Sequence, residues 1–244
     1  MTENGRPAED DFPVQEIFTN LEWDDLIVNP VIKEKIVQAR LDIKSRLIDR
    51  ATLYGPLGTG KTTTAALLGK TLVQKVYRIN APKLTLYNAG EMKSYLNQFF
   101  IKAQENAWIL VLHEPYALFR NSDAEISEFL IEKIKSHKGV ILFIINGENQ
   151  EENAFYNKDY KTIIFTKPNA EERLLLWKEY LAFNKDLQDP EFLTEISENF
   201  AVTGGQIVNA VRRAGVIALK RNNPPLVQKK DLVAAITAEI KKVN

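Results

Sequence analysis

Cysteine is missing from this chain of 244 residues, and histidine occurs only twice. Without cysteine there can be no disulfide framework and no thiolate metal site, which favours a reducing compartment such as the cytoplasm. Two histidines are too few for a metal site built from several imidazole ligands. We therefore expect a cytoplasmic protein that needs neither kind of site.

The formal net charge is zero, because 32 Lys and Arg residues balance 32 Asp and Glu residues. Proteins with a broad nucleic-acid footprint usually carry a basic excess, so nucleic acid is not the expected partner, although a local basic patch stays possible. No apolar run reaches the roughly 20 residues that span a bilayer. The polar, acidic start of the chain lacks the layout of a signal peptide. We expect no membrane partner.

Short apolar runs alternate with helix-length segments through the first two thirds of the chain. The runs cover residues 51–54, 75–79, 108–112, 140–145 and 162–165. This alternation predicts an α/β fold with a largely parallel sheet. After residue 166 only helical patterns follow. Asn169 and Thr203 each have a Glu or Gln three positions later, as in a capping box, and Asp189 precedes a proline at a typical helix start.

The segment GPLGTGKT, residues 55–62, has the G-x-x-x-x-G-K-T pattern and lies between a predicted strand and a predicted helix. Glycines let the backbone N–H groups surround phosphates, and the N-terminus of the following helix adds positive potential. Lys61 would reach the β- and γ-phosphates, and the Thr62 hydroxyl would bind Mg²⁺. A glycine-rich turn that matches by chance is the alternative, and the flanking elements disfavour it. ATP and Mg²⁺ are therefore the expected cofactors. The expected loop contacts are Gly55, Pro56, Leu57, Gly58, Thr59, Gly60, Lys61, Thr62 and Thr63.

The apolar run WILVL ends at His113 and Glu114, and the next run ends at Asn146. A phosphate-loop protein needs a carboxylate for magnesium and a group that positions the attacking water. Glu114 is expected to polarise that water, whereas His113 could contact magnesium only weakly, through a water molecule. Asn146 could bond to the γ-phosphate or to the water. We take Lys61, Glu114 and Asn146 as candidate catalytic residues. Alternatively, His113 and Glu114 are only the polar end of a core strand, and Asn146 is only a turn residue.

With these elements in this order, the chain resembles an AAA+ ATPase module over about residues 21–244. It resembles in particular the AAA+ ATPases encoded with bacterial extracellular contractile injection systems, the phage-tail-like particles. The stretches that carry this narrower resemblance are LEWDDLIV, GPLGTGKTTTAALLGK, VYRIN, AWILVLHEPYALF, AEISEFLIEKIKSHKGVILFIIN and PNAEERLLLWKEYL. The resemblance implies ATP hydrolysis, a homo- or hetero-oligomeric ring, and a protein substrate or injection-particle component as the partner.

The residue patterns divide the chain into a flexible leader (residues 1–19), an α/β nucleotide-binding domain of P-loop NTPase type (20–167) and a small all-helical lid domain (168–244). The resemblance implies further nucleotide contacts. In the lid, Gly204 and Gly205 would contact the nucleotide. Leu26, Ile27 and Val28 would wall the adenine pocket, or would be plain core residues.

The chain departs from this family in its catalytic strand and in its expected intersubunit residues. His113 replaces the metal-holding aspartate, and Tyr116 stands where a second acidic residue is usual. Asn157, Lys158 and Asp159 occupy the place of the arginine fingers, and lysine lacks the bidentate fork of a guanidinium. An arginine finger contributes about 10³–10⁵ in rate. Hydrolysis is therefore expected to be slow or absent while ATP binding persists.

The pore loop departs too, because Asn88 falls where the family has the aromatic residue that grips a threaded substrate. Tyr87 lies one position earlier and would either replace that aromatic or pack at the base of the loop. Three functions therefore stay open: a low-activity ATPase that remodels a protein partner, a non-hydrolytic ATP-binding subunit of a ring and, less favoured, a DNA-loading AAA+ protein.

Overall fold

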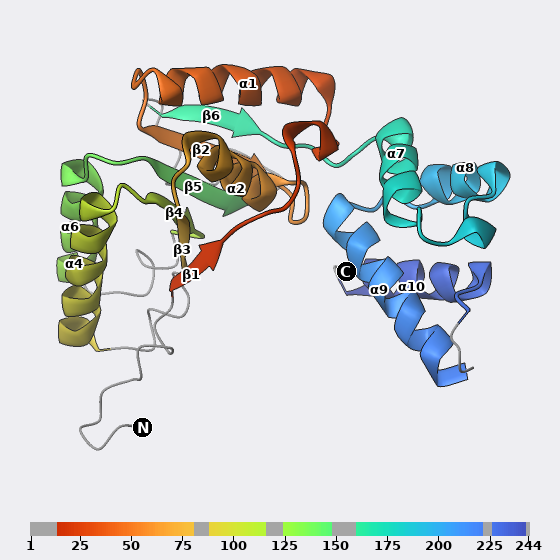
Figure 1. The fold of residues 1–244 in the computed structure, drawn as a ribbon. Helices are drawn as coiled ribbons and strands as arrows, with labels where there is room; N and C mark the ends of the chain where they lie inside the picture. Colours follow the sequence, from red (N-terminus) through yellow and green to blue (C-terminus); the bar gives the residue numbers. More distant parts are fainter. Residues whose placement is uncertain (1–13, 81–87, 116–123, 148–159, 222–225, 243–244) are drawn as a thin grey trace. The chain divides into compact units, whose positions relative to one another are not determined.

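The structure is a computed structural model that describes residues 14–80, 88–115, 124–147, 160–221 and 226–242. These residues form two compact units (Figure 1). The first unit gathers Glu34–Tyr54, Lys61–Ile164 and the described part of Met1–Trp23, and the second unit gathers Asp24–Lys33, Gly55–Gly60 and Phe165–Asn244.

The described strands form a six-stranded sheet in the order β1-β3-β4-β5-β2-β6. They are β1 (Val14–Ile17), β2 (Arg50–Gly55), β3 (Val76–Asn80), β4 (Ile109–His113), β5 (Ile141–Asn146) and β6 (Lys161–Ile164). Strands β3, β4 and β5 pair in parallel, as do β2 and β6, whereas β1 is antiparallel to β3. The five strands expected from the apolar runs, and the predicted α/β class with a mostly parallel sheet, are confirmed.

Strand β1 lies in the segment that was expected to be a flexible leader. Val14 to Ile17 pair in register with Ile79 to Val76. Tyr77 also donates its hydroxyl to the Glu16 carboxylate at 3.0 Å, and the Lys75 ammonium lies 3.4 Å from that group. The leader prediction was therefore wrong for residues 14–17, because four residues with two polar ones at the centre carry no periodic signal, and cross-strand contacts hold them.

Helices cover the sheet of the first unit. Helices α2 (Lys61–Leu72), α4 (Ala89–Glu105) and α6 (Ala124–Ser136) belong to this unit, whereas η2 (Trp23–Asp25) and α1 (Pro30–Lys44) have residues in both units. Helices α4 and α6 lie side by side (Figure 1). Leu96 and Phe99 of α4 and Leu130 of α6 pack against Leu110 and Phe143 of the sheet in one buried cluster. Because β4 and β5 are buried in this way, their sequences are apolar along most of their length.

A buried guanidinium joins the start of β2 to the end of α6. Arg50 is 8% exposed and donates to the carbonyl oxygens of Ile134 at 2.7 Å, His137 at 2.5 Å and Gly139 at 2.7 Å. Carbonyl groups at a helix C-terminus lack partners within the helix and carry partial negative charge, so a cation is favoured there. Arg50 thereby fixes the strand that leads into the glycine-rich loop.

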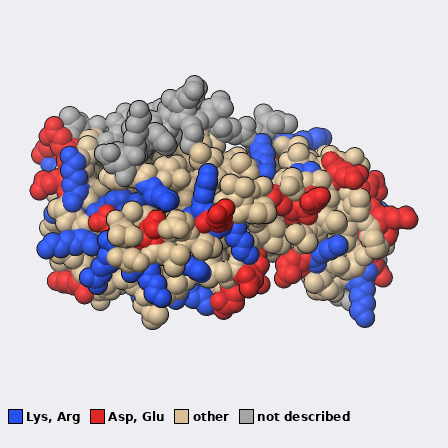
Figure 2. Space-filling view, turned by 90° about the horizontal axis from the view of Figure 1, so that it is seen from above, with Lys and Arg blue, Asp and Glu red and all other residues tan. Residues whose placement is uncertain are grey.

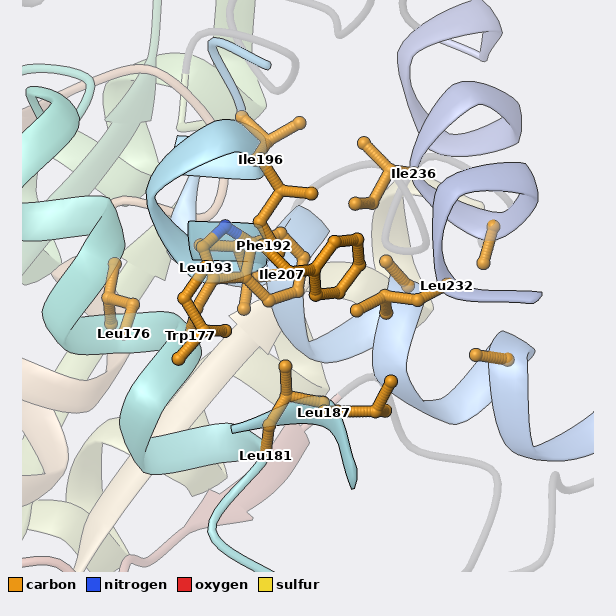
Figure 3. Packing of buried hydrophobic residues seen from close by; sticks show 14 residues of the cluster. Leu176, Trp177, Leu181, Leu187, Phe192, Leu193, Ile196, Ile207, Leu232 and Ile236 are labelled. Atoms are coloured by element: carbon orange, nitrogen blue, oxygen red, sulfur yellow. The ribbon is translucent and has the colours of Figure 1, made fainter. Parts of the chain in front are cut away.

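The second unit contains a helical domain with a core of its own. Its described helices are α7 (Ala170–Tyr180), η4 (Lys185–Leu187), α8 (Pro190–Asn199), α9 (Gly204–Arg221) and α10 (Lys229–Lys241). Trp177 is fully buried and packs with Leu176, Phe192, Ile207 and Ile236 (Figure 3). None of the described helices has the length and apolar character needed to cross a bilayer.

The helix starts expected in this unit are confirmed. Asn169 accepts the Glu172 backbone N–H at 2.9 Å, and Glu172 accepts the Asn169 N–H at 3.0 Å. Asp189 caps α8 ahead of its proline, and the Thr203 backbone N–H donates to the Gln206 side chain at 2.8 Å. The domain boundary expected near residue 167 stays a prediction, because contacts alone do not establish which parts fold independently.

His137 makes the first unit sensitive to acid. Its ring is 4% exposed and lies edge-on to Phe100 at 5.6 Å, and burial lowers its pKa from 6.5 to about 4, with the Arg50 charge adding to the effect. Because the folded-state pKa is depressed, the unfolded chain binds a proton between pH 6.5 and 4 that the folded chain does not. The stability contributed by this group is therefore lost as the pH falls through that window.

We expect the free energy of unfolding of the natural chain to fall by about 2–3 kcal/mol more than that of His137→Phe between pH 7 and pH 4. Phenylalanine keeps a ring at this position but does not titrate, so carboxylate effects cancel in the comparison. Urea unfolding at intervals of one pH unit measures the difference. Parallel pH profiles for the two proteins would contradict the assignment.

Candidate nucleotide site

The glycine-rich loop belongs to the second unit and has the backbone that its sequence predicts. Gly55, Gly58 and Gly60 have φ values of +144°, +78° and +99°, a region that residues with a Cβ rarely adopt. A Cβ on Gly55 would lie 2.2 Å from the Phe165 carbonyl oxygen, so the space also requires glycine. Within the loop, the Thr59 hydroxyl donates to the Pro56 carbonyl at 2.8 Å, and Leu57 is exposed.

The start of α9 touches this loop within the same unit. The Gly205 N–H donates to the Gly58 carbonyl at 2.9 Å. A Cβ on Gly58 would lie 2.7 Å from the Thr203 hydroxyl oxygen, and a Cβ on Gly205 would lie 2.8 Å from the Gly58 Cα. The glycines of the Gly204–Gly205 pair therefore permit a close backbone approach between the loop and the helix. Both residues lie where the resemblance places nucleotide contacts, and that role stays a prediction.

The predicted adenine-wall residues separate into two groups. An added Cβ on Gly60 would lie 3.3 Å from Leu26 Cδ1 and 3.7 Å from Val28 Cγ1, so these two side chains adjoin the loop. Ile27 instead packs against the apolar cluster around Trp177. Leu26 and Val28 are thus the candidates for a nucleotide contact, and Ile27 has the structural role that was the alternative.

The predicted catalytic residues Lys61, Glu114 and Asn146 belong to the first unit. Lys61 is the first residue of α2, is 4% exposed and is followed by the half-buried Thr62 and Thr63. Burial lowers the pKa of Lys61 to about 8, and the Glu114 carboxylate opposes that shift. Lys61 is therefore mostly protonated at neutral pH and lies within the electrostatic influence of Glu114.

Glu114 and Asn146 are joined directly by a hydrogen bond. The Asn146 backbone N–H donates to Glu114 Oε1 at 2.7 Å, and the Glu114 N–H donates to the Ile144 carbonyl at 2.9 Å. Glu114 is 8% exposed and has a φ of +53°, which is uncommon for a residue with a Cβ.

The second carboxylate oxygen of Glu114 and the side-chain oxygen of Asn146 are buried. Neither has a hydrogen-bond partner among the described residues. Buried oxygens of this kind are normally satisfied by protein, water or ligand. The pair can therefore accept hydrogen bonds from a bound molecule, as its predicted catalytic role requires.

His113 ends β4 beside this pair and is half-buried. Burial lowers its pKa below 6.5, Glu114 raises it, and the positive charges of Arg78 and Lys61 lower it further. The imidazole is accordingly neutral at pH 7 and brings no negative charge to the end of the strand.

The residues present fit a nucleotide better than they fit a metal ion. The positive-φ glycines and the buried Lys61 suit phosphate groups. The described part of the chain contains no group of three or more His, Asp or Glu residues that could hold a metal ion. The Thr62 hydroxyl remains the candidate protein ligand for Mg²⁺, with His113 at most a weak contact through water and with the phosphates completing the set.

Arg78 is a charged neighbour of this site that the sequence analysis missed. It lies on β3, where it pairs with Val111 of β4, two residues before His113. Counting alternate residues along two adjacent strands would have found it, because positions two apart share one face of a sheet.

Asn88 has a structural role at the predicted pore loop. It caps α4, where its side chain accepts the Glu91 N–H at 3.0 Å and its own N–H donates to Glu91 at 3.4 Å. Such a capping box favours asparagine over an aromatic residue. The expectations for Tyr87, Tyr116, Asn157, Lys158 and Asp159 concern positions outside the described residues.

Comparison with known proteins finds similarity to AAA ATPases. Residues 51–156 match the family model described as "ATPase family associated with various cellular activities (AAA)". A putative 26S proteasome regulatory subunit homologue of Methanocaldococcus jannaschii is 27% identical over 52% of this chain and 38% of its own length. Spastin of Xenopus tropicalis is 26% identical over 78% of this chain and 34% of its own length. The chain thus spans well under half the length of these relatives.

Solved structures share the fold at lower identity. The FIGL-1 AAA domain in complex with ADP matches with a TM-score of 0.73 and 16% identity, covering 93% of this chain and 86% of that one. A structure described as the basis for katanin self-assembly matches with a TM-score of 0.72 and 21% identity, covering 90% and 85%. These relatives do not support the narrower resemblance to contractile injection systems.

The family match over residues 51–156, the fold and the backbone of the glycine loop agree with one another: this part of the chain is similar to AAA ATPases, and the chain shares the fold of solved AAA domains.

Proposed function

We propose that the chain binds ATP through residues 55–63 and couples binding, with slow hydrolysis, to the remodelling or assembly of a protein partner. The observation that carries this proposal is the Glu114–Asn146 pair, which ends two adjacent strands and has Lys61 as an electrostatic neighbour. The FIGL-1 domain that shares the fold was solved with ADP, which supports a nucleotide as the ligand.

The chemistry divides among the residues of the site. Lys61 at the start of α2 would bind the β- and γ-phosphates. Glu114 Oε1 is held by the Asn146 N–H, which leaves Oε2 to accept a hydrogen bond from the attacking water. The Asn146 side-chain oxygen could accept a second hydrogen bond from that water. A bound Mg²⁺ would supply positive charge at the phosphates.

The neutral His113 is the reason to expect slow turnover. It replaces the carboxylate that would hold the water shell of a magnesium ion, and a neutral imidazole gives little attraction for a dication. The same residue favours the second candidate function, a non-hydrolytic ATP-binding subunit that completes a ring. Turnover measurements separate the two functions.

The partner is proposed to be protein rather than nucleic acid. The formal net charge is zero, and the molecular face in Figure 2 carries basic and acidic side chains interspersed. Assembly into a homo- or hetero-oligomeric ring in the cytoplasm is part of the proposal, and katanin, which shares the fold, is described as self-assembling. A place in a contractile injection system rests on sequence resemblance alone, and genes for sheath, tube and spike proteins beside this one would support it.

Replacing Lys61 with alanine should weaken ATP binding by about tenfold or more, because a charged contact to phosphate is lost. Titration of a fluorescent ATP analogue measures the change. Lys70→Ala is the matched control, since Lys70 lies on the same helix but pairs with Glu22 at 2.5 Å. Equal affinities for the natural chain and for Lys61→Ala would argue against the site.

Restoring a carboxylate at His113 should raise ATP turnover. We expect His113→Asp to increase kcat by about tenfold or more, because negative charge at this position supports magnesium-assisted hydrolysis. His113→Asn is nearly the same size as aspartate but neutral, so it should leave kcat low. Steady-state phosphate release measures all three proteins. Brisk turnover by the natural chain would refute the proposed impairment.

ATP should increase the proportion of a ring-sized species if the site lies in an assembling subunit. Sedimentation at several protein concentrations, with and without ATP, measures the mass. The Lys61→Ala variant should lose the response to ATP but keep the mass of the nucleotide-free protein. A monomer under every condition would contradict assembly into a homo-oligomer and leave a hetero-oligomeric ring as the form to test.

A further inference from the structure

Arg78 belongs to the same face of the sheet as the candidate catalytic strand end. Along β3, Val76 and Arg78 point to one face, and an added Cβ on Gly69 of α2 would lie 2.2 Å from Val76 Cγ2. That face is therefore the one covered by α2, the helix that begins at Lys61. Because Arg78 pairs with Val111, the next position on the same face of β4 is His113.

The guanidinium of Arg78 is incompletely satisfied. One terminal nitrogen donates to the Gln15 side-chain oxygen at 2.5 Å, and Gln15 is neutral. The Nε atom is buried and has no hydrogen-bond partner among the described residues. The ion pairs of the described residues include none with Arg78, so its charge is not neutralised by a paired carboxylate there. Arg78 as a whole is half-buried, and a buried N–H without a partner on a charged guanidinium points to an anionic partner.

The charges of the site therefore differ from those of a magnesium-centred site. Two cations, Lys61 and Arg78, act on the region around His113, where Glu114 is the one acidic group that influences the imidazole. Such an excess of positive charge attracts phosphate oxygens and repels a divalent cation. The phosphate charge that a metal ion usually balances can be met in part by the chain itself.

We propose that this site binds nucleotide without requiring Mg²⁺, and that Arg78 supplies part of the positive charge a metal ion would otherwise provide. The proposal rests on the proposed function, because it concerns the same nucleotide site. It assigns to Arg78 an electrostatic role in binding the polyphosphate and gives it no part in bond cleavage.

The test is a titration of a fluorescent ATP analogue against the full chain, in excess Mg²⁺ and in excess EDTA. The natural chain should give dissociation constants that agree within about threefold. His113→Asp should become metal-dependent, with binding weakened by about tenfold or more in EDTA, because the added carboxylate repels phosphate unless a cation intervenes.

Arg78→Met should weaken binding in EDTA by about fivefold to tenfold and should weaken it less in Mg²⁺. Arg78→Lys should largely rescue binding in EDTA, which loss of packing alone would not predict. Lys75→Met is the matched control, because it removes the same charge from a residue just before β3. Lys75 pairs with Glu16 at the surface. Its affinity should not change in either buffer.

The outcomes separate this inference from the proposed function. Binding that needs Mg²⁺ in the natural chain, or equal loss for Arg78→Met and Lys75→Met, would overturn the inference and leave ATP binding intact. No binding in either buffer would overturn both. If Arg78→Met fails to fold, the natural chain and His113→Asp still decide whether binding requires the metal.

Discussion

The hydrogen bond from the Asn146 amide to the Glu114 carboxylate is the contact on which the site depends. It joins the ends of β4 and β5, and it holds Glu114 in a conformation that residues with a Cβ seldom adopt. One oxygen of the carboxylate thereby accepts a hydrogen bond from the protein, and the other is buried without a partner among the described residues. Parallel pairing makes the contact possible, because the carboxyl ends of adjacent strands meet at one edge.

The charges around this contact differ from those expected from the family that the sequence resembles. His113 removes a negative charge from the strand end, and Arg78 places a positive charge two positions lower on the neighbouring strand. Both changes make the local electrostatic potential more positive. They favour retention of a phosphate-bearing ligand and weaken the attraction for a divalent ion. The proposed combination of nucleotide binding with slow turnover rests on this distribution of charge.

Local patterns made much of the fold predictable. Five strands, the glycine loop and the helix caps at Asn169 and Thr203 each depend on a few neighbouring residues, so their local sequences were enough to predict them. Strand β1 was not predictable, because pairing with β3 holds its four residues. Arg78 was missed for a related reason, since its position relative to His113 follows from strand register rather than from spacing along the chain. The sequence did not distinguish the role of Ile27 from the roles of Leu26 and Val28, because the difference lies in how each side chain packs.

The separate core of the second unit has a practical consequence for spectroscopy. The chain has three tryptophans, and Trp177 is the one that belongs to the second unit. Its indole is fully buried, and its N–H has no hydrogen-bond partner among the described residues. An indole in such an apolar environment emits fluorescence at shorter wavelengths than an indole in water. With Trp23 and Trp108 replaced by phenylalanine, fluorescence would report on the helical unit alone, so nucleotide effects on that unit could be followed without a label.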